Sequence, residues 1–339
     1  MWLKVIDPQV TRVFERIVHT QIGLKQGEQV LIVADPAAEE EKLAALTSAI
    51  SAAGGIFTII VQPNVGWKPN DPYALTDPCQ LAYVGADVVI AATMSSSSSL
   101  YGRPQAYRDL MSRKEKVRMF SMVERPFEII VADTADYHEI KRNNERLKEL
   151  FKKGHRVRIT NRAGTDFVGS ADDIEYDKLW GHLSHEGFAL QPGDFGAAPD
   201  GETHIPPPPE SMEGLLVVDG PVANICDVRP DEPIRLAVKK GRILKIEGGR
   251  DAAKLDKLVH DLEQDYVAEI GLGTNPAWVV SRSLHGVKKG LGNTHVAYGG
   301  WWGFQPKIPY KVHGDMVMYE GTLEIDGKVV MAGGKLFLD

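Results

Sequence analysis

The chain has 339 residues, of which 43% are hydrophobic and 25% are charged, and its formal net charge at pH 7 is −7. This length is enough for two domains with separate cores, and the composition is that of an ordinary globular protein. The negative charge argues against nucleic acid as a partner, because nucleic-acid-binding proteins need a basic surface. The opening MWLKVIDPQV lacks the pattern of a signal peptide, and no apolar run is long enough to span a membrane. We therefore expect a cytoplasmic protein without a membrane partner.

Helical and strand patterns alternate along the first 155 residues. Helices are predicted at 9–24 and 37–53, and strands at 28–36, 57–63, 85–94 and 117–124. Alternation at this spacing predicts parallel strands joined by crossover helices. The fold class expected for residues 1–155 is therefore a doubly wound α/β domain.

This α/β domain has no nucleotide fingerprint. After VLIVA the chain continues with AspProAlaAla instead of a glycine-rich turn, which argues against a phosphate site at the following helix. A run of five serines at 95–99 follows the third predicted strand. We interpret this run as a flexible loop, with a position over a neighbouring cleft as the alternative.

After a charged helix at 139–153 the sequence changes to short alternating strands separated by turns such as KKG and DGK. One helix is expected among these strands, at about 250–266. The four consecutive prolines at 206–209 predict a stiff, extended segment. We therefore expect a mostly β (α+β) domain over residues 156–339, with the boundary near residue 155.

The C-terminal half also contains acidic and imidazole side chains next to glycine or proline. They are Glu202, Glu269, His295, His313 and Asp315. Three carboxylates and two imidazoles are suitable ligands for one or two divalent metal ions. His313 and Asp315 are two residues apart, so on an extended segment both project from one face. We predict that these five residues form a metal-binding catalytic site.

The segments that contain these residues resemble the M29 metallopeptidases of the aminopeptidase T/S type. GETHIPPPPESMEGLLVVDG, AEIGLGTNP, GNTHVAYGG and VHGD occur in the order and approximate spacing of that family, and GEQVLIVADP looks like part of its first domain. The resemblance implies two zinc, cobalt or manganese ions bound by the five residues, with Glu269 bridging them. It also implies hydrolysis of an amide or peptide bond by metal-activated water. Glu269 and His295 would then be catalytic, the substrate a small molecule or short peptide, and the protein a homodimer.

Two features depart from the peptidase pattern. The tyrosine expected seven residues after the first metal-binding histidine is Trp302 here, and the segment between His295 and His313 is compressed. This segment is rich in aromatic residues. We predict that Tyr298, Trp301 and Trp302 form an apolar wall for a small ring-bearing substrate, with a simple aromatic cluster in a loop as the alternative.

Other histidines are weaker candidates. His204 lies two residues after Glu202, and we expect it to support the metal site or to contact substrate. His182 and His185 are flanked by glycines, which favour a loop. We therefore interpret them as surface or substrate-side groups and not as metal ligands.

A second branch of the same superfamily, the 2,5-dihydroxypyridine dioxygenases, is also similar to this chain in its length and in EGLLVVD and DGKVVMAGG. This resemblance implies ring cleavage by one Fe(II) bound to two histidines and one carboxylate, a set available as His295, His313 and Asp315. Those enzymes have a histidine at the position of Glu269, so the ligand set favours hydrolysis. A third hypothesis is a binding protein that has kept the fold and lost turnover.

Overall fold

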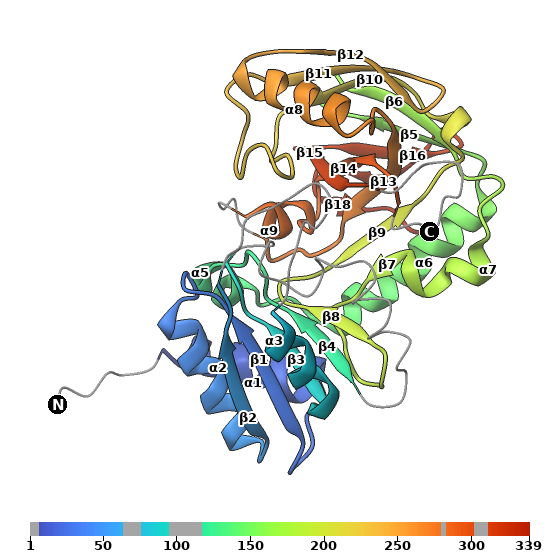
Figure 1. The fold of residues 1–339 in the computed structure, drawn as a ribbon. Coiled ribbons are helices and arrows are strands. Elements are labelled where there is room, and N and C mark those ends of the chain that lie inside the picture. Colours follow the sequence, from blue (N-terminus) through green and yellow to red (C-terminus); the bar gives the residue numbers. More distant parts are fainter. Residues whose placement is uncertain (1–6, 64–75, 95–116, 279–282, 302–310) are drawn as a thin grey trace. The chain divides into compact units, whose positions relative to one another are not determined.

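The computed structural model describes residues 7–63, 76–94, 117–278, 283–301 and 311–339 (Figure 1). The chain divides into two compact units. The first contains Met1–Thr134 and Glu186–Asp200, and the second contains Ala135–His185 and Gly201–Asp339. None of the described helices is long and apolar enough to cross a membrane.

The division between the units comes one helix earlier than the change in sequence pattern near residue 155. Helix α6 (Tyr137–Lys153) packs against β7 (Ser184–His185) and β9 (Glu202–Ile205) of the second unit. Its Asn144 side chain donates hydrogen bonds to the carbonyl oxygens of His185 and Glu202, at 3.1 and 3.0 Å. These long-range contacts join α6 to the unit that follows it.

A parallel sheet forms the centre of the first unit. Its described strands, in spatial order, are β2 (Ile56–Val61), β1 (Gln29–Ala34), β3 (Val88–Ala91), β4 (Arg118–Ser121) and β8 (Phe195–Ala197). Every pairing among them is parallel. The serine run at 95–99 lies outside the described residues.

Helices cover both faces of this sheet. Val30 and Ile32 of β1 pack in one core with α1 (Pro8–Glu15), its π-helical continuation Arg16–Gln21, and α2 (Glu40–Ala52). Leu31 and Val33 pack in a second core with α3 (Asp77–Ala82) and Tyr83. Because alternate strand residues enter different cores, the predicted doubly wound α/β arrangement is confirmed.

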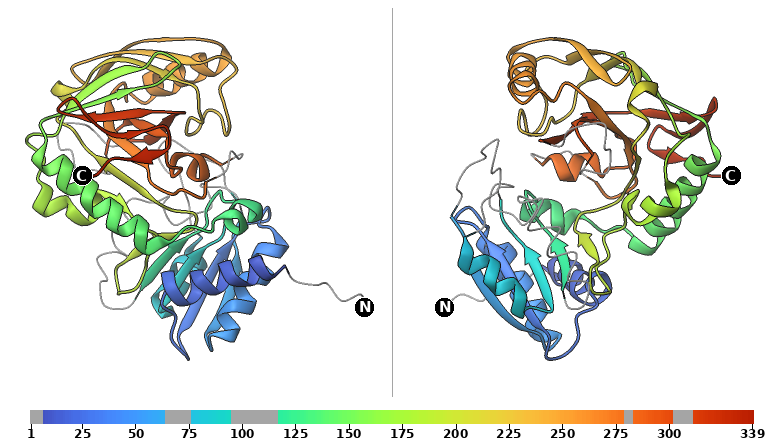
Figure 2. Two further views of the ribbon diagram at one scale, coloured as in Figure 1. Left: turned by 180° about the vertical axis from the view of Figure 1, so that it is seen from behind. Right: turned by 45° about the vertical axis from the view of Figure 1, so that its right-hand side comes forward.

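The larger sheet of the second unit is antiparallel. Its described strands, in spatial order, are β12 (Arg242–Glu247), β11 (Ile234–Lys239), β10 (Glu213–Val218), β6 (Asp166–Ser170), β5 (Arg156–Thr160), β16 (Thr322–Ile325), β17 (Lys328–Ala332) and β18 (Lys335–Leu336). Lys240–Gly241 and Asp326–Gly327 make tight turns with positive φ, as the KKG and DGK motifs predict. Helix α8 (Arg250–Asp261) packs against β11 and β12 (Figure 2).

A second antiparallel sheet of this unit carries the predicted ligands. In spatial order its described strands are β15 (His313–Met318), β14 (Thr294–Gly299), β13 (Val267–Gly273), β9 and β7. Every residue of β13 and β14 is buried, as expected of strands at the centre of a sheet. Short helices α7 (Tyr176–Leu179) and α9 (Leu284–Lys288) complete the unit, and α9 packs against β15.

Candidate metal centre

The register of the β15–β14–β13 strands brings four of the predicted ligands to one face of the sheet. Ala297 at the middle of β14 pairs with Asp315 of β15 on one side and with Glu269 of β13 on the other. His295 and His313 each lie two residues from a member of this row. Because side chains on a strand alternate between faces, all four point to the same side as Ala297.

The neighbouring strands β9 and β7 continue this face. Gly271 of β13 pairs with His295 on one side and with His204 of β9 on the other, and Glu202 of β9 pairs with His185 of β7. A Cβ atom on Gly271 would lie 2.2 Å from Nε2 of His295 and 3.0 Å from Cβ of His204. Because Gly271 has no side chain, the His295 ring can lie across β13. All five predicted ligands meet on one face of the sheet.

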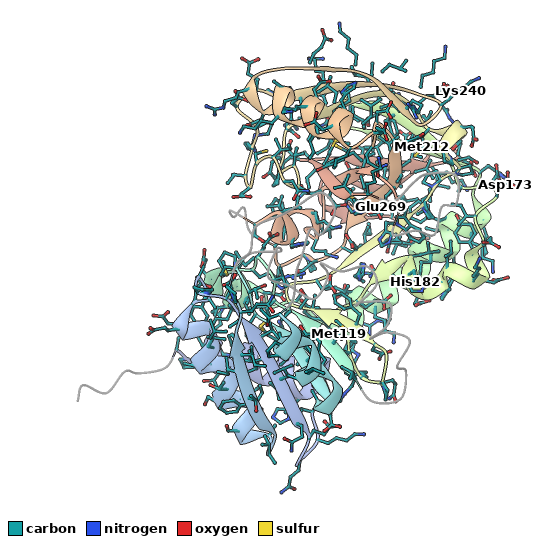
Figure 3. The ribbon with its side chains drawn as sticks, in the orientation of Figure 1. Met119, Asp173, His182, Met212, Lys240 and Glu269 are labelled. Atoms are coloured by element: carbon teal, nitrogen blue, oxygen red, sulfur yellow. The ribbon has the colours of Figure 1, made fainter. Side chains whose placement is uncertain are left out.

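Glu269, labelled in Figure 3, has contacts with three imidazoles of this cluster, those of His204, His295 and His313. Its Oε1 is 3.2 Å from Nε2 of His295, and its Oε2 accepts a 2.7 Å hydrogen bond from Nε1 of Trp301 and lies 3.8 Å from Nε2 of His313. Burial alone would raise the pKa of Glu269, but the surrounding imidazoles, His204 foremost, outweigh burial and lower it to about 2. Glu269 is therefore a carboxylate with a fixed orientation.

His313 and Asp315 lie two residues apart on β15 and project from the same face of this strand. Nδ1 of His313 lies 2.9 Å from the carbonyl oxygen of Gly300, which only accepts, so Nδ1 carries the proton and Nε2 faces the carboxylates. Nε2 is 3.6 Å from Oδ1 of Asp315. Burial would lower the pKa of His313, but Asp315 and Glu269 outweigh burial and raise it. A divalent cation would take over the role of the proton on this imidazole.

The donor set fits a metal ion. Glu269, His295 and Asp315 each offer one ligand atom, and these atoms lie within 4.8 Å of one another. Oδ1 of Asp315 is buried and has no hydrogen-bond partner among the described residues. Such an atom costs free energy unless a cation or donor satisfies it. Imidazole and carboxylate together suit Fe(II), zinc, cobalt or manganese.

A second group of potential ligands consists of His185, Glu202 and His204, whose ligand atoms also lie within 4.8 Å of one another. Nε2 of His185 is 3.5 Å and Nδ1 of His204 is 3.8 Å from Oε1 of Glu202. The two rings stack with centroids 5.5 Å apart. Burial lowers the pKa of His204. His204 thus lies beside Glu202, and so does His185, which the sequence favoured as a surface or substrate-side group.

Two lysines that the sequence did not single out also reach this face. Nζ of Lys288 is 2.7 Å from Oδ2 of Asp315 and 3.2 Å from Oε2 of Glu202, and Nζ of Lys289 is 2.5 Å from Oε1 of Glu202. Burial would raise the pKa values of both carboxyls, but the ammonium groups, Lys288 foremost, hold them well below their usual range. The only sequence signal was a lysine pair beside Gly290, a pattern far more often found on solvated surfaces.

A model of the family described as 2,5-dihydroxypyridine 5,6-dioxygenase (NicX) matches residues 9–338. The chain belongs to this family. A curated NicX-family relative, the 2,5-dihydroxypyridine 5,6-dioxygenase of Pseudomonas putida KT2440, is 28% identical over 221 residues, which are 62% of this chain. The match spans 57% of that relative, less than two thirds of its length.

Two solved structures have the same fold. The 2,5-dihydroxypyridine dioxygenase of P. putida KT2440 has a TM-score of 0.75 and 20% identity, with 98% of each chain covered. Wild-type AmpT from Thermus thermophilus has a TM-score of 0.65 and 15% identity, with 97% of this chain and 98% of AmpT covered. The NicX match thus supports the ring-cleaving alternative better than the aminopeptidase interpretation, which the predicted ligand set had favoured. The similarity to the M29 type shows a shared fold only.

In this NicX-family member the two described residues of the predicted aromatic wall, Tyr298 and Trp301, lie differently with respect to the candidate site. Tyr298 alternates with Ala297 and so points to the opposite face of β14 from the ligands. Its hydroxyl donates a 2.9 Å hydrogen bond to the carbonyl oxygen of Ala223. Trp301 does lie at the cluster, where it binds Glu269 and makes an edge contact with His204 at 6.0 Å between ring centroids. Trp302 lies outside the described residues.

Proposed function

We propose that the protein is an Fe(II)-dependent dioxygenase that cleaves the ring of a hydroxylated pyridine. The match of the NicX family model to residues 9–338 is the observation that carries the proposal. The partial match to the P. putida enzyme of that name supports it. The face of the β15–β14–β13 strands offers the two imidazoles and one carboxylate typical of non-haem Fe(II) oxygenases.

The residues that would hold the iron are His295, His313 and Asp315. When bound, Fe(II) would supply the one-electron chemistry with dioxygen that ring cleavage requires. The chain itself orients the ligands: the Gly300 carbonyl sets the tautomer of His313, and Trp301 holds the adjacent carboxylate of Glu269. Burial of these side chains excludes bulk water and strengthens electrostatic interactions at the site.

The proposed reaction balances without an added reductant. Both atoms of dioxygen enter the product: the O–O bond and one carbon–carbon bond of the ring break, and two new carbon–oxygen bonds form. The ring is oxidised and dioxygen is reduced. The reaction therefore needs only the aromatic substrate, dioxygen and the iron-loaded protein.

The proposal is tested by loading the metal-free protein with Fe(II) under anaerobic conditions and then adding 2,5-dihydroxypyridine and air. We expect one iron per chain, consumption of one dioxygen per substrate, and loss of the ring absorbance. His313→Ala should weaken iron binding more than about 100-fold. This is more than the usual loss when a residue that only hydrogen-bonds to a metal ligand is replaced. His155→Ala is a suitable control, because His155 is exposed and contacts Asp172 at 2.8 Å.

A two-metal hydrolase is the second candidate function, because all five ligands predicted from the M29 resemblance meet on one face. It would bind two zinc, cobalt or manganese ions and cleave an amide or short peptide without consuming dioxygen. That outcome would contradict the dioxygenase proposal. Full metal occupancy without turnover of either substrate class would instead favour a binding protein.

A further inference from the structure

Lys288 and Lys289 place two positive charges on the carboxylates of the cluster. Both oxygens of Glu202 face an ammonium group, Oε1 that of Lys289 at 2.5 Å and Oε2 that of Lys288 at 3.2 Å. Lys288 also contacts Asp315 at 2.7 Å. Both lysine side chains are buried, at 8% and 6% exposure. Each oxygen of Glu202 thus lies beside a positive charge, although Oε2 has no hydrogen-bond partner among the described residues.

The backbone that carries these lysines is anchored on both sides. The hydroxyl of Ser283 caps the start of α9, and Nδ2 of Asn293 donates a 2.8 Å hydrogen bond to the Val287 carbonyl. The Lys289 carbonyl accepts a 2.9 Å hydrogen bond from the backbone nitrogen of Asn275. The main chain at Lys288 and Lys289 is therefore fixed, and both side chains reach Glu202 from defined positions.

The charge of the cluster leaves room for one divalent ion. The three carboxylates Glu202, Glu269 and Asp315 carry three negative charges, and the two ammonium groups neutralise two of them. One divalent ion brings the total to one positive charge, whereas a second would bring it to three. Two like unit charges about 4 Å apart repel by about 4 kcal/mol at an effective dielectric constant near 20, so a second dication beside two ammonium groups is strongly opposed.

We propose that the ammonium groups of Lys288 and Lys289 take the place of a second metal ion beside Glu202. The protein then binds one divalent ion, at His295, His313 and Asp315, and the group His185–Glu202–His204 binds none while the lysines are present. The inference rests on the metal dependence proposed above. This replacement would explain why a chain that has all five ligands of a two-metal site binds only the one iron that the proposed reaction needs.

The test is the number of metal ions bound per chain. Metal-free wild type and the double variant Lys288→Met/Lys289→Met are each equilibrated with Mn(II), and bound metal is counted by mass spectrometry after dialysis. We expect one equivalent in the wild type and two in the double variant, with a spin-coupled manganese signal in the electron paramagnetic resonance spectrum of the variant only. Lys148→Met is a matched control and should stay at one equivalent, because Lys148 is also buried and pairs with a carboxylate, Glu145, at 2.8 Å.

Two equivalents in the wild type would overturn the inference, as would one equivalent in a double variant that keeps the wild-type circular dichroism spectrum.

Removing both lysines leaves buried carboxylates without counter-charges and can prevent folding. In that case the wild-type count and the single variant Lys289→Met decide, the latter with an expected gain of a second, weaker ion. Ring cleavage by iron-loaded wild type is scored separately. Cleavage with two metals bound would refute the lysine inference and the expected one-iron stoichiometry, but not ring cleavage itself. One metal without cleavage would refute only the proposed function.

Discussion

The indole nitrogen of Trp301 donates a 2.7 Å hydrogen bond to Oε2 of Glu269. Both side chains are buried, and the bond leaves Oε1 of Glu269 directed at Nε2 of His295, 3.2 Å away. A hydrogen bond to a charged group contributes about 1.5–3 kcal/mol, roughly twice a neutral one. Trp301, which we predicted to form part of a wall for the substrate, therefore orients the central carboxylate of the candidate metal centre.

Replacing Trp301 with phenylalanine should keep the ring and remove only this hydrogen bond. We expect metal affinity to fall by about 10- to 100-fold, as is usual when a partner of the ligand set is lost. Isothermal titration with Mn(II) would measure the change. The control is Trp180→Phe, since Nε1 of Trp180 donates to a carboxylate remote from the cluster, Glu145, at 3.1 Å. Equal affinity losses in the two variants would contradict the orienting role.

Gly271→Ala should displace the His295 imidazole, because the new Cβ would lie 2.2 Å from Nε2. We expect loss of at least about 90% of the ring-cleavage activity, together with overpacking that costs about 1–3 kcal/mol of the free energy of unfolding. Steady-state kinetics and urea unfolding would measure both effects. Gly181→Ala is the control, because a Cβ there would meet nothing within 4 Å. Full activity in Gly271→Ala would show that His295 is not needed in its observed position.

Tyr298→Phe separates a structural role from a role in substrate binding. The Tyr298 hydroxyl donates to the Ala223 carbonyl and accepts a 3.3 Å hydrogen bond from Asn224, on the face of β14 away from the ligands. We expect the free energy of unfolding to fall by about 1 kcal/mol and the KM for the aromatic substrate to stay unchanged. A higher KM at unchanged stability would restore the predicted contact of Tyr298 with substrate.

Lys42 gives the first unit a specific pH dependence. Its Nζ is buried, 3.1 Å from the carbonyl oxygen of Arg125 and 3.8 Å from Glu39. Burial lowers the pKa of Lys42 to about 8, against the partly compensating charges of Glu39 and Asp35. Between pH 8 and 10.5 the unfolded chain therefore binds more protons at this position than the folded one, so the free energy of unfolding contributed by Lys42 rises with pH in that window.

The measurement compares wild type with Lys42→Met by urea unfolding at pH 8 and pH 10. Relative to the variant, wild type should gain roughly 2 kcal/mol over this interval, since one pKa unit corresponds to about 1.4 kcal/mol. Exposed Lys257, which contacts Asp261 at 2.6 Å, provides a control variant, Lys257→Met, that should show no such gain. A constant difference between wild type and Lys42→Met would mean that Lys42 titrates alike in both states.

Much of the fold could be predicted from local sequence. The strands at β1 to β4 and the helices α2, α6 and α8 lie within a few residues of their predicted positions, because apolar periodicity and glycine turns are local signals. Helix α6 lies before the change in sequence pattern but packs with the unit that follows it. Its Asn144 bonds to strands that lie 41 and 58 residues further along the chain, which no local pattern reports.

By itself the sequence determined which side chains could bind a metal, because ligand chemistry belongs to residue type and the His313–Asp315 spacing needs only an extended strand. Tertiary structure alone decided which groups share the site. Strand register placed His185 beside Glu202 and turned Tyr298 away, and the anchored end of α9 brought Lys288 to Asp315. These positions depend on pairing between segments far apart in the chain, and a one-residue change in register would move each side chain to the opposite face.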